Sequence, residues 1–270
     1  MSSLKDVKNI DSLIGFLETK GKNHNYYYHY TSWDSFIKIY TGQSFLLTRG
    51  NSLIINDQHE ALMKGSWETW NKTYIGSFSF GSSENMAMWG LYGLPWEDAV
   101  RISIPKEAML YWINKTYSVS LWDKGVEGTI NSPKISLTDI VYAGNDKYGG
   151  LKLIHNDKYF NTRSIRELSG LDTNPKMTGY IKNHAWQYEN EVRIRVELPQ
   201  DTGYEKILLN IPQETINAIQ VTTGPYFRWK KDELYKQLCE QNRVVESGFK
   251  NLVRYRAICS MCQHENFVRK

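Results

Sequence analysis

The stretch from Glu189 to Leu198 (ENEVRIRVEL) has a charged side chain at every second position, and from Val192 onward the intervening positions are all apolar. This is the period of a β-strand, in which successive side chains point to opposite faces. One face would carry Val192, Ile194 and Val196. The pattern therefore predicts a strong strand late in the chain, with one apolar face and one charged face.

The charged face of this strand allows two interpretations. It carries Glu189, Glu191, Arg193, Arg195 and Glu197. On pattern alone we favour a solvated face, on which cross-strand ion pairs contribute about 0.2–1 kcal/mol each. However, Trp186 and Tyr188 come just before the carboxylates. A carboxylate beside aromatic walls can bind a ribose hydroxyl and stabilise an oxocarbenium ion, so a catalytic site is the alternative.

Other segments predict further strands and helices. Strands are expected at Tyr26–Thr31, Phe45–Thr48, Leu53–Ile55, Thr73–Phe80, Asp98–Ile104, Tyr117–Leu121, Ile135–Tyr142, Glu205–Asn210, Ala218–Pro225 and Leu252–Ile258. Helices are expected in residues 1–24, after the capping residue Ser32 as far as Gly42, from the capping residue Asp57 (with Glu60 three positions on), at Ser83–Gly93, after Pro105, at Thr162–Leu168, in the segment before Glu189, and at Trp229–Glu240.

Strands outnumber helices, and several neighbours are close enough along the chain to pair antiparallel. We therefore expect one α+β domain over residues 1–270, with a split, mostly antiparallel sheet, flanking helices and a cleft between its halves. Between Asn145 and Pro175 the pattern breaks down into glycines and asparagines. This segment is expected to be an insertion or a mobile loop.

Several classes of protein are disfavoured by what the sequence lacks. No run of about 18 apolar residues is present, so a membrane span is not expected. Three cysteines, Cys239, Cys259 and Cys262, make a disulfide framework unlikely and favour a reduced, cytoplasmic setting. Cys259, Cys262 and His264 form half a zinc motif without a second pair, so chance spacing is favoured and no metal is expected. Rossmann and Walker glycine motifs are missing as well.

Five short motifs occur in order. They are YHYTS (Tyr28–Ser32), NDQHE (Asn56–Glu60), GSFSF leading to MWGLY (Met88–Tyr92), W-x-YE-x-E-x-R (Trp186–Arg193) and GP (Gly224–Pro225). Together they resemble a widespread bacterial family catalogued as a domain of unknown function, from about Tyr26 to the end of the chain. That family is in turn distantly similar to the ADP-ribosyltransferase fold, whose enzymes cleave NAD at the nicotinamide–ribose bond. This second step is an analogy at the level of the fold.

The resemblance implies catalytic roles for three residues. Glu191 or Glu189 would take the place of the late, strand-borne glutamate of these enzymes. His29 would take the role of the residue on an early strand that binds NAD. The alternative for His29 is a hydrogen-bonded structural histidine.

The resemblance also implies a set of cofactor contacts. Tyr92 or Trp89 would stack on nicotinamide, and Tyr30, Thr31 and Tyr74 would add further contacts. Arg193 would bind the pyrophosphate, or it would neutralise Glu191. Trp89 and Tyr92 also have the spacing of an ordinary core pair on one helix face.

The implied activity is an NAD-dependent ADP-ribosyltransferase, acting on nucleic acid or protein as a bacterial toxin or an anti-phage defence effector. Two alternatives are a non-catalytic sensor that binds a nucleotide or a partner, and an NAD hydrolase. The segments YFRWKK (Tyr226–Lys231) and KNLVRYRA (Lys250–Ala257) mix rings with basic residues, as single-stranded nucleic acid would require. For each segment taken singly, a solvated surface is favoured. The net charge of +4 permits a polyanionic partner without requiring one.

Overall fold

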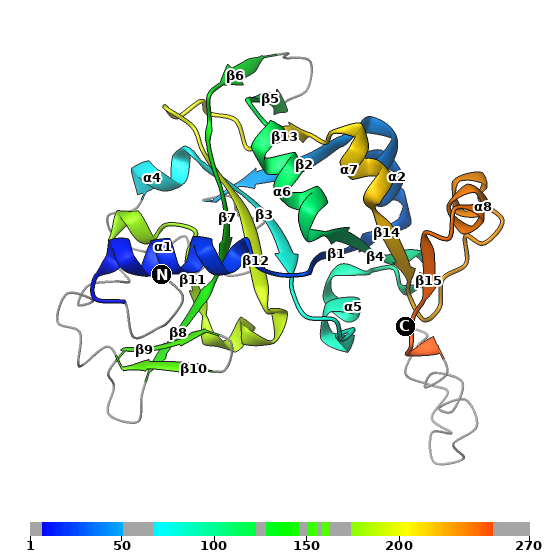
Figure 1. Cartoon of the computed structure of the whole chain (residues 1–270), viewed down its shortest axis with the longest axis horizontal. Helices are drawn as coiled ribbons and strands as arrows, with labels where there is room; N and C mark the ends of the chain where they lie inside the picture. The colour runs from blue at the N-terminus through cyan, green and yellow to red at the C-terminus, as the bar shows by residue number, and fades with distance from the viewer. Residues whose placement is uncertain are drawn as a thin grey trace, which may run out of the picture.

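Strand β3 (Thr73–Ser79) determines the layout of the sheet, because one of its edges is fully paired and the other is paired only in part. The computed structural model describes residues 7–50, 67–122, 128–145, 151–155, 158–161 and 174–250. Within these ranges the protein is a mixed α/β structure with a large, mostly antiparallel sheet and flanking helices (Figure 1). The α+β class predicted from the sequence is thus confirmed at this level.

The strands form two sheets within the described ranges. The large sheet contains β1 (Tyr26–Ser32), β2 (Ser44–Arg49), β3, β4 (Ala99–Pro105), β5 (Ser118–Trp122), β6 (Thr129–Asn131), β7 (Lys134–Asp139), β12 (Glu191–Glu197), β13 (Lys206–Asn210), β14 (Gln220–Thr223) and β15 (Val244–Glu246). The smaller sheet contains β8 (Val141–Asn145), β9 (Leu151–His155), β10 (Lys158–Asn161) and β11 (Ile181–Asn183).

The helices of the described ranges lie around these sheets (Figure 1). They are α1 (Ile10–Gly21), α2 (Trp33–Gly42), α4 (Trp67–Asn71), α5 (Met86–Tyr92), α6 (Lys106–Lys115), α7 (Gln213–Ala218) and α8 (Glu233–Glu240), with 3₁₀ helices at Trp96–Asp98, Pro175–Met177 and His184–Glu189. None of them is long and apolar enough to cross a membrane.

The large sheet is split at β3. One edge of β3 pairs with β12 along its whole length, from Glu191 opposite Ser79 to Glu197 opposite Thr73. The other edge is shared by two strands at opposite ends. There β1 pairs only through Tyr28 and Ser79, and β2 pairs only near Ile75. Within the described strands, residues 76–78 therefore have no ladder partner on this edge, and β1 and β2 diverge across it.

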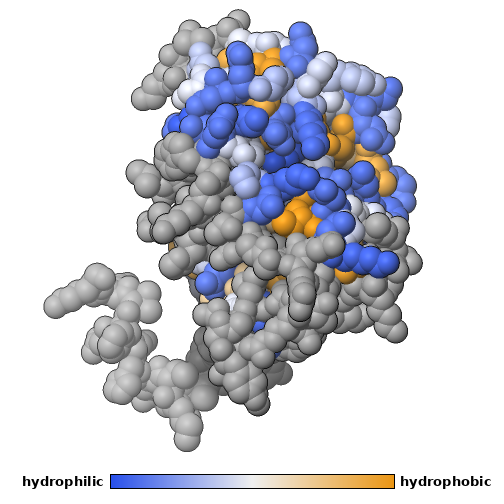
Figure 2. Space-filling model, turned by 90° about the vertical axis from the view of Figure 1, so that its left-hand side faces the viewer, coloured by the Kyte–Doolittle hydropathy of each residue, from blue (hydrophilic) through white to orange (hydrophobic). Residues whose placement is uncertain are grey.

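The main core fills one face of the large sheet. Val192, Ile194 and Val196 are fully buried in it, as the alternation in β12 predicts. The indoles of Trp33 and Trp112, on α2 and α6, belong to the same cluster. The face of the molecule on which α1 lies is mostly hydrophilic among the described residues, with apolar residues in small separate groups (Figure 2). Burial is thus concentrated between the sheet and its helices.

The smaller sheet joins the large one at Ile140, between β7 and β8. The backbone N–H of Ile140 donates to the carbonyl of Glu191 (3.2 Å). Next to it, the buried carboxylate of Asp139 accepts hydrogen bonds from His24 Nε2 (2.5 Å) and His155 Nε2 (2.8 Å). Since His155 belongs to β9, this contact ties the two sheets together near the start of β12.

Several local predictions are confirmed. Ser32 caps α2 by accepting from the backbone N–H of Ser35 (3.2 Å), and the helix ends at Gly42. Pro105 immediately precedes α6. The remaining predicted strands and helices on described residues occur close to the expected positions.

Four predictions need correction. The expected strand at Ile135–Tyr142 is two strands, because the chain passes between sheets at Ile140. The expected loop at 145–175 contains β9 and β10. The expected helix before Glu189 is β11 followed by a 3₁₀ helix, because β11 pairs with β8 and tertiary pairing overrides helix propensity. The last helix is short and begins at Glu233, after the capping residue Asp232.

Other predictions lie outside the described residues. They are the strands at Leu53–Ile55 and Leu252–Ile258, the helix starting with Asp57 and Glu60, the NDQHE motif at Asn56–Glu60, the helix at Thr162–Leu168, and the half zinc motif of Cys259, Cys262 and His264.

Two glycines of α1 give a matched test of how this helix packs. A Cβ on Gly21 would lie 2.6 Å from the carbonyl oxygen of Leu137 and from Cα of Thr138 in β7, whereas a Cβ on Gly15 would meet nothing within 4 Å. We expect Gly21→Ala to lower the free energy of unfolding by about 1–3 kcal/mol, because the helix must move off the strand. Gly15→Ala should raise it by about 0.5–1 kcal/mol. Urea unfolding measures both, and equal effects would contradict this packing.

Candidate functional site

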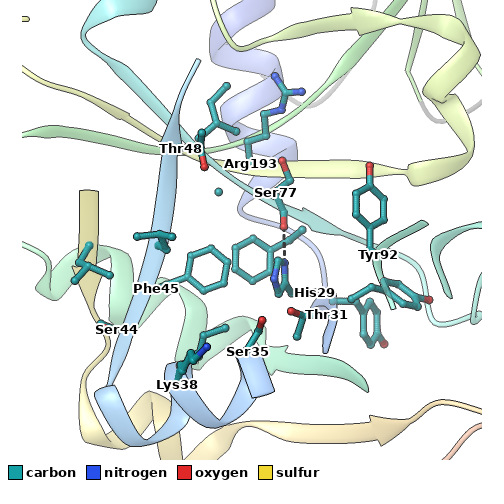
Figure 3. A pocket seen from close by; sticks show the side chains of 18 of the residues that line it. His29, Thr31, Ser35, Lys38, Ser44, Phe45, Thr48, Ser77, Tyr92 and Arg193 are labelled. Atoms are coloured by element: carbon teal, nitrogen blue, oxygen red, sulfur yellow. Dashed lines mark hydrogen bonds between the residues drawn. The ribbon is translucent and has the colours of Figure 1, made fainter. Parts of the chain in front are cut away.

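A cavity of about 790 Å³ opens where β1 and β2 diverge from β3 (Figure 3). Helix α2 connects these two strands and lies beside the opening. Gly76 widens it, because a Cβ at this position would lie 2.9 Å from the ring of Phe45. Among the residues that line the cavity are Tyr28, His29, Tyr30, Thr31, Ser35, Lys38, Phe45, Thr48, Ser77, Tyr92, Trp122, Lys182, Glu189, Glu191 and Arg193. The split in the sheet is therefore what creates the cavity.

One wall of the cavity is a buried ion pair on β12. Glu191 Oε1 accepts from Arg193 Nε (2.7 Å), and Glu191 Oε2 accepts from Arg193 Nη2 (3.0 Å). The guanidinium also donates from Nη1 to the carbonyl of Gly179 (3.2 Å). Side chains two apart on a strand share a face, so the pair forms within one strand. The bidentate geometry fixes the carboxylate in place.

Lys182 joins this pair to a second carboxylate. Its Nζ donates to Glu189 Oε2 (2.6 Å) and to Glu191 Oε2 (3.1 Å). Glu189 Oε1 accepts in turn from the hydroxyl of Tyr92 on α5 (2.6 Å). The lysine comes from β11 in the smaller sheet. Residues from three separate parts of the chain thus form one hydrogen-bonded cluster on the cavity wall.

Glu189 reaches this cluster by a different route from the predicted one. The sequence places Glu189 on the same strand as Glu191, with both carboxylates on one face. In the structure Glu189 ends the 3₁₀ helix, and Asn190 follows with φ +45°, outside the strand. The prediction of a shared strand is therefore wrong. The two carboxylates are brought together by Lys182.

The expectation of a solvated charged face is also wrong. Glu191 is 2% exposed, Arg193 2% and Arg195 3%. Charges at this depth are tolerated only when they are paired and hydrogen-bonded, and a lone buried ion would cost several kcal/mol. Arg195 meets this condition by donating to the carbonyl of Thr178 (2.9 Å) and to Glu197 (3.1 Å). The charged face of β12 is therefore buried, with its charges paired and hydrogen-bonded.

The pKa values of the two carboxyl groups are shifted in opposite directions. Burial raises the pKa of Glu189, and the neighbouring charge of Glu191 raises it further, against Lys182 and Tyr92. Burial would also raise the pKa of Glu191, but Arg193 and Lys182 outweigh burial and hold this pKa well below its usual range. Glu191 is therefore an anion at neutral pH, whereas Glu189 exchanges a proton more readily. Such a divided pair is the arrangement expected of an ionic stabiliser and an acid–base group.

His29 bridges the gap between β1 and β3. Its Nδ1 donates to the carbonyl of Ser77 (2.9 Å), one of the residues of β3 that lack a ladder partner on the edge facing β1 and β2 (Figure 3). Burial lowers the pKa of His29, so the ring is neutral near pH 7. Since a carbonyl can only accept, the proton is assigned to Nδ1, and Nε2 is left as an acceptor. The structural and the functional interpretation of His29 are therefore compatible.

The aromatic candidates divide into two groups. Tyr92, Tyr30 and Thr31 line the cavity, together with His29. Trp89 does not: it is 1% exposed, packs edge-on against Tyr30 and donates from Nε1 to Glu84. Tyr74 is fully buried on the core face of β3, and its hydroxyl donates to the carbonyl of Tyr204 (2.7 Å). Trp89 and Tyr74 are therefore corrected from cofactor walls to core residues.

Sequence reasoning missed three residues of the site. Lys182 was hidden because its segment was expected to be a helix, on which its contact with Glu189 could not be foreseen. Ser77 contributes its main-chain carbonyl to His29 and its side chain to Glu191 as a hydrogen-bond partner, and neither contact is indicated by the side-chain pattern. Lys38 lies on the cavity side of α2 in an exposed pair with Asp34 (2.6 Å). It stands one turn from Ser35, a spacing that carries no signal of its own.

Comparison of this chain with models of protein families, with curated proteins and with solved structures finds no match. Within the described residues, no three side chains of His, Cys, Asp or Glu are grouped so as to hold a metal ion. What the site can do is therefore argued from its own geometry.

The unequal environments of the two glutamates predict unequal effects on stability. At pH 7, Glu191→Gln should lower the free energy of unfolding by about 3–5 kcal/mol, because Arg193 and Lys182 lose their anion in a buried site. Glu189→Gln should cost about 1 kcal/mol, because its site already favours the neutral form. Urea unfolding of both variants beside wild type gives the comparison. Equal costs would show that the two carboxyl groups are equivalent.

A pH series gives an independent check on Glu191. Its folded-state pKa lies below the unfolded value, so its contribution to stability is present above the unfolded value of about 4.5 and is lost as the pH falls through the folded value. Wild type should therefore lose stability on acidification by more than Glu191→Gln does. Unfolding midpoints at pH 7, 4 and 3 measure this difference, and parallel losses would refute it.

Proposed function

We propose that this protein is an NAD-dependent ADP-ribosyltransferase. The observation that carries the proposal is the pair of carboxylates with opposite pKa displacements, linked by Lys182 on the wall of a cavity that also holds His29 and Tyr92. A convergence of these residues is what the resemblance to the ADP-ribosyltransferase fold requires. The acceptor would be nucleic acid or protein, consistent with a toxin or an anti-phage defence effector.

Glu191 would act on the ribose that loses nicotinamide. The bond from ribose C1′ to the nicotinamide nitrogen breaks, and its electron pair leaves with the nicotinamide, which becomes neutral. The sugar carbon then carries the positive charge. A fixed anion in a site shielded from water stabilises this charge more strongly than bulk water would. Arg193 and Lys182 keep Glu191 ionised and oriented.

Glu189 would serve the acceptor. A nucleophile on the acceptor forms the new bond to C1′ and passes its proton to the Glu189 carboxylate. A base with a raised pKa is better matched to this task near neutral pH than an ordinary carboxylate. The hydrogen bonds from Tyr92 and Lys182 hold the group in place, one to each oxygen. If water takes the acceptor's place, the same chemistry is NAD hydrolysis.

The remaining residues would bind the cofactor. The acceptor nitrogen Nε2 of His29 suits a ribose hydroxyl. Tyr92 offers a ring at the cavity wall beside Glu189, where nicotinamide would lie, and Tyr30 lines the same cavity. Thr31 adds a hydroxyl from the same strand as His29. Arg193 is committed to Glu191, so its part is to orient the catalytic carboxylate.

One observation favours a second function, a sensor that binds a nucleotide without cleaving it. The oxygens of Glu191 already accept two hydrogen bonds from Arg193 and one from Lys182, and the side chain of Ser77 is a further hydrogen-bond partner. A carboxylate has about four acceptor positions, so Glu191 retains little capacity for substrate. In a sensor the cluster would only shape the cavity. Cleavage of NAD separates the two functions.

Nicotinamide release from NAD by the purified protein tests the proposal. We expect release by wild type, measured with and without total cellular nucleic acid or protein as acceptor. Glu191→Gln should reduce the rate at least about 100-fold. Arg195→Gln serves as the control, because it alters a neighbouring buried charge of β12 that does not line the cavity. A folded wild type that releases no nicotinamide with any acceptor would contradict the proposal and favour the sensor.

The pH dependence of the rate tests the role of Glu189. Because the base must be ionised, the rate should rise with pH through the raised pKa of Glu189 and then level off. Glu189→Gln should remove this rise and lower the plateau about 100- to 10,000-fold for transfer to an acceptor. A rise that persists in Glu189→Gln would assign the titration to another group.

A further inference from the structure

A row of side chains in register leads from the cavity to the far part of the same sheet face. Ile75 on β3 lies opposite Thr48 on β2, Thr48 lies opposite Lys206 on β13, and Lys206 lies opposite Trp122 on β5. Residues directly opposite one another on paired strands share a face. With strands about 4.8 Å apart, the row extends roughly 14 Å from Ile75 to Trp122.

An apolar platform lies at and beside this row: Trp122 ends the row, and Leu46 and Leu208 form the neighbouring pair on the same face. Leu46 on β2 lies opposite Leu208 on β13, and both line the cavity together with Trp122. Trp122 is 54% exposed and Leu46 is 38% exposed, although both belong to regular strands. Large apolar side chains grouped on an exposed surface commonly mark a binding site. We refer to Leu46, Leu208 and Trp122 as the β5 platform.

One cation lies next to Trp122 in the row, and another lines the cavity. Lys206 lies between Thr48 and Trp122 in the row and forms no ion pair with any described residue. Lys38 lines the cavity from α2 and is held only by its exposed pair with Asp34. Such an exposed pair is weak, so a phosphate can displace the aspartate. The positive charges of Lys38 and Lys206 would attract an anion bound between the platform and the rest of the cavity.

We propose that the β5 platform binds the adenylate half of the dinucleotide, with adenine stacked on Trp122 and the pyrophosphate between Lys38 and Lys206. This inference rests on the proposed function, because it assumes that the other ribose lies at Glu191. The platform and Glu191 line one continuous cavity, so a single ligand can reach both only if it is long and carries a ring at each end. A dinucleotide has this form.

The chemistry of the platform also sets the contribution of each group. A planar base gains most from an indole face, and base–aromatic stacking is lost when the ring is truncated. The ammonium of Lys206 acts as a point charge and provides no directional recognition. Trp122 should therefore decide whether a base binds, and Lys206 should strengthen binding only when the ligand carries phosphate.

Binding of ADP to the full chain tests this inference by calorimetry. ADP has the proposed base and pyrophosphate but no nicotinamide bond, so its binding does not depend on catalysis. We expect Trp122→Ala to raise the Kd for ADP at least about tenfold and Trp122→Phe to raise it less. Lys206→Gln should weaken ADP but leave adenosine unchanged.

Matched controls exclude general effects of the substitutions. Tyr117→Ala removes an exposed ring (70% exposed) just before β5 that does not line the cavity, and Lys231→Gln removes an exposed lysine elsewhere. Neither should change the Kd for ADP. Unfolding curves confirm that each variant is folded.

Each remaining outcome decides the inference. Failure of wild type to bind ADP, or unchanged binding by Trp122→Ala, overturns it. Binding of a single-stranded oligonucleotide but not ADP, dependent on Trp122, overturns it and assigns the platform to the acceptor. A dimer that Trp122→Ala dissociates assigns it to a second copy of this chain. Binding of ADP through Trp122 without any nicotinamide release supports the platform while the proposed catalysis fails.

Discussion

The divergence of β1 and β2 along one edge of β3 is the constraint on which the rest of the structure depends. A fully paired β3 would leave no space between these strands, because neighbouring strands in a ladder lie about 4.8 Å apart. The opposite edge of β3 is held by β12 along seven residue pairs, so the strand stays in place although it is only partly paired on this side. The unpaired stretch exposes backbone acceptors to the cavity, and His29 takes one of them. The cavity and the position of His29 follow from the same feature.

The site also requires the buried charge cluster of Lys182, Glu189, Glu191 and Arg193, and burying these charges costs stability. Four ionisable side chains lie almost out of water, and replacing such a network with apolar residues is often neutral or stabilising in other proteins. Its presence on the wall of a cavity, and not between packed elements, favours a functional reason for it. The same reasoning explains why the two glutamates differ: one has a guanidinium bound to both of its oxygens, and the other faces a lysine that it must share.

The sequence predicts local features well and their juxtaposition poorly. The alternation at Val192, Ile194 and Val196 and the cap at Ser32 depend on neighbouring residues, and both were predictable. The burial of Arg193 was not, because a strand pattern separates two faces without saying which of them is covered. Lys182 was beyond reach for a related reason: its strand exists through pairing with β8, some forty positions earlier. The resemblance supplied Glu191, Tyr92 and His29 as candidates, and their meeting in one cavity depends on the split sheet.

Lys182 belongs to the smaller sheet. Of its two partners, Glu189 lies just before β12 and Glu191 is the first residue of β12, in the large sheet. The cluster is therefore complete only when the two sheets are docked, and the contact of Asp139 with His155 and His24 is one of the joints that holds them. Before the smaller sheet is docked, the site lacks this lysine. A chain at that stage would contain two neighbouring glutamates without their shared cation, and their mutual repulsion would keep the site in a different protonation state. The site therefore depends on the docking of the two sheets as well as on its local geometry.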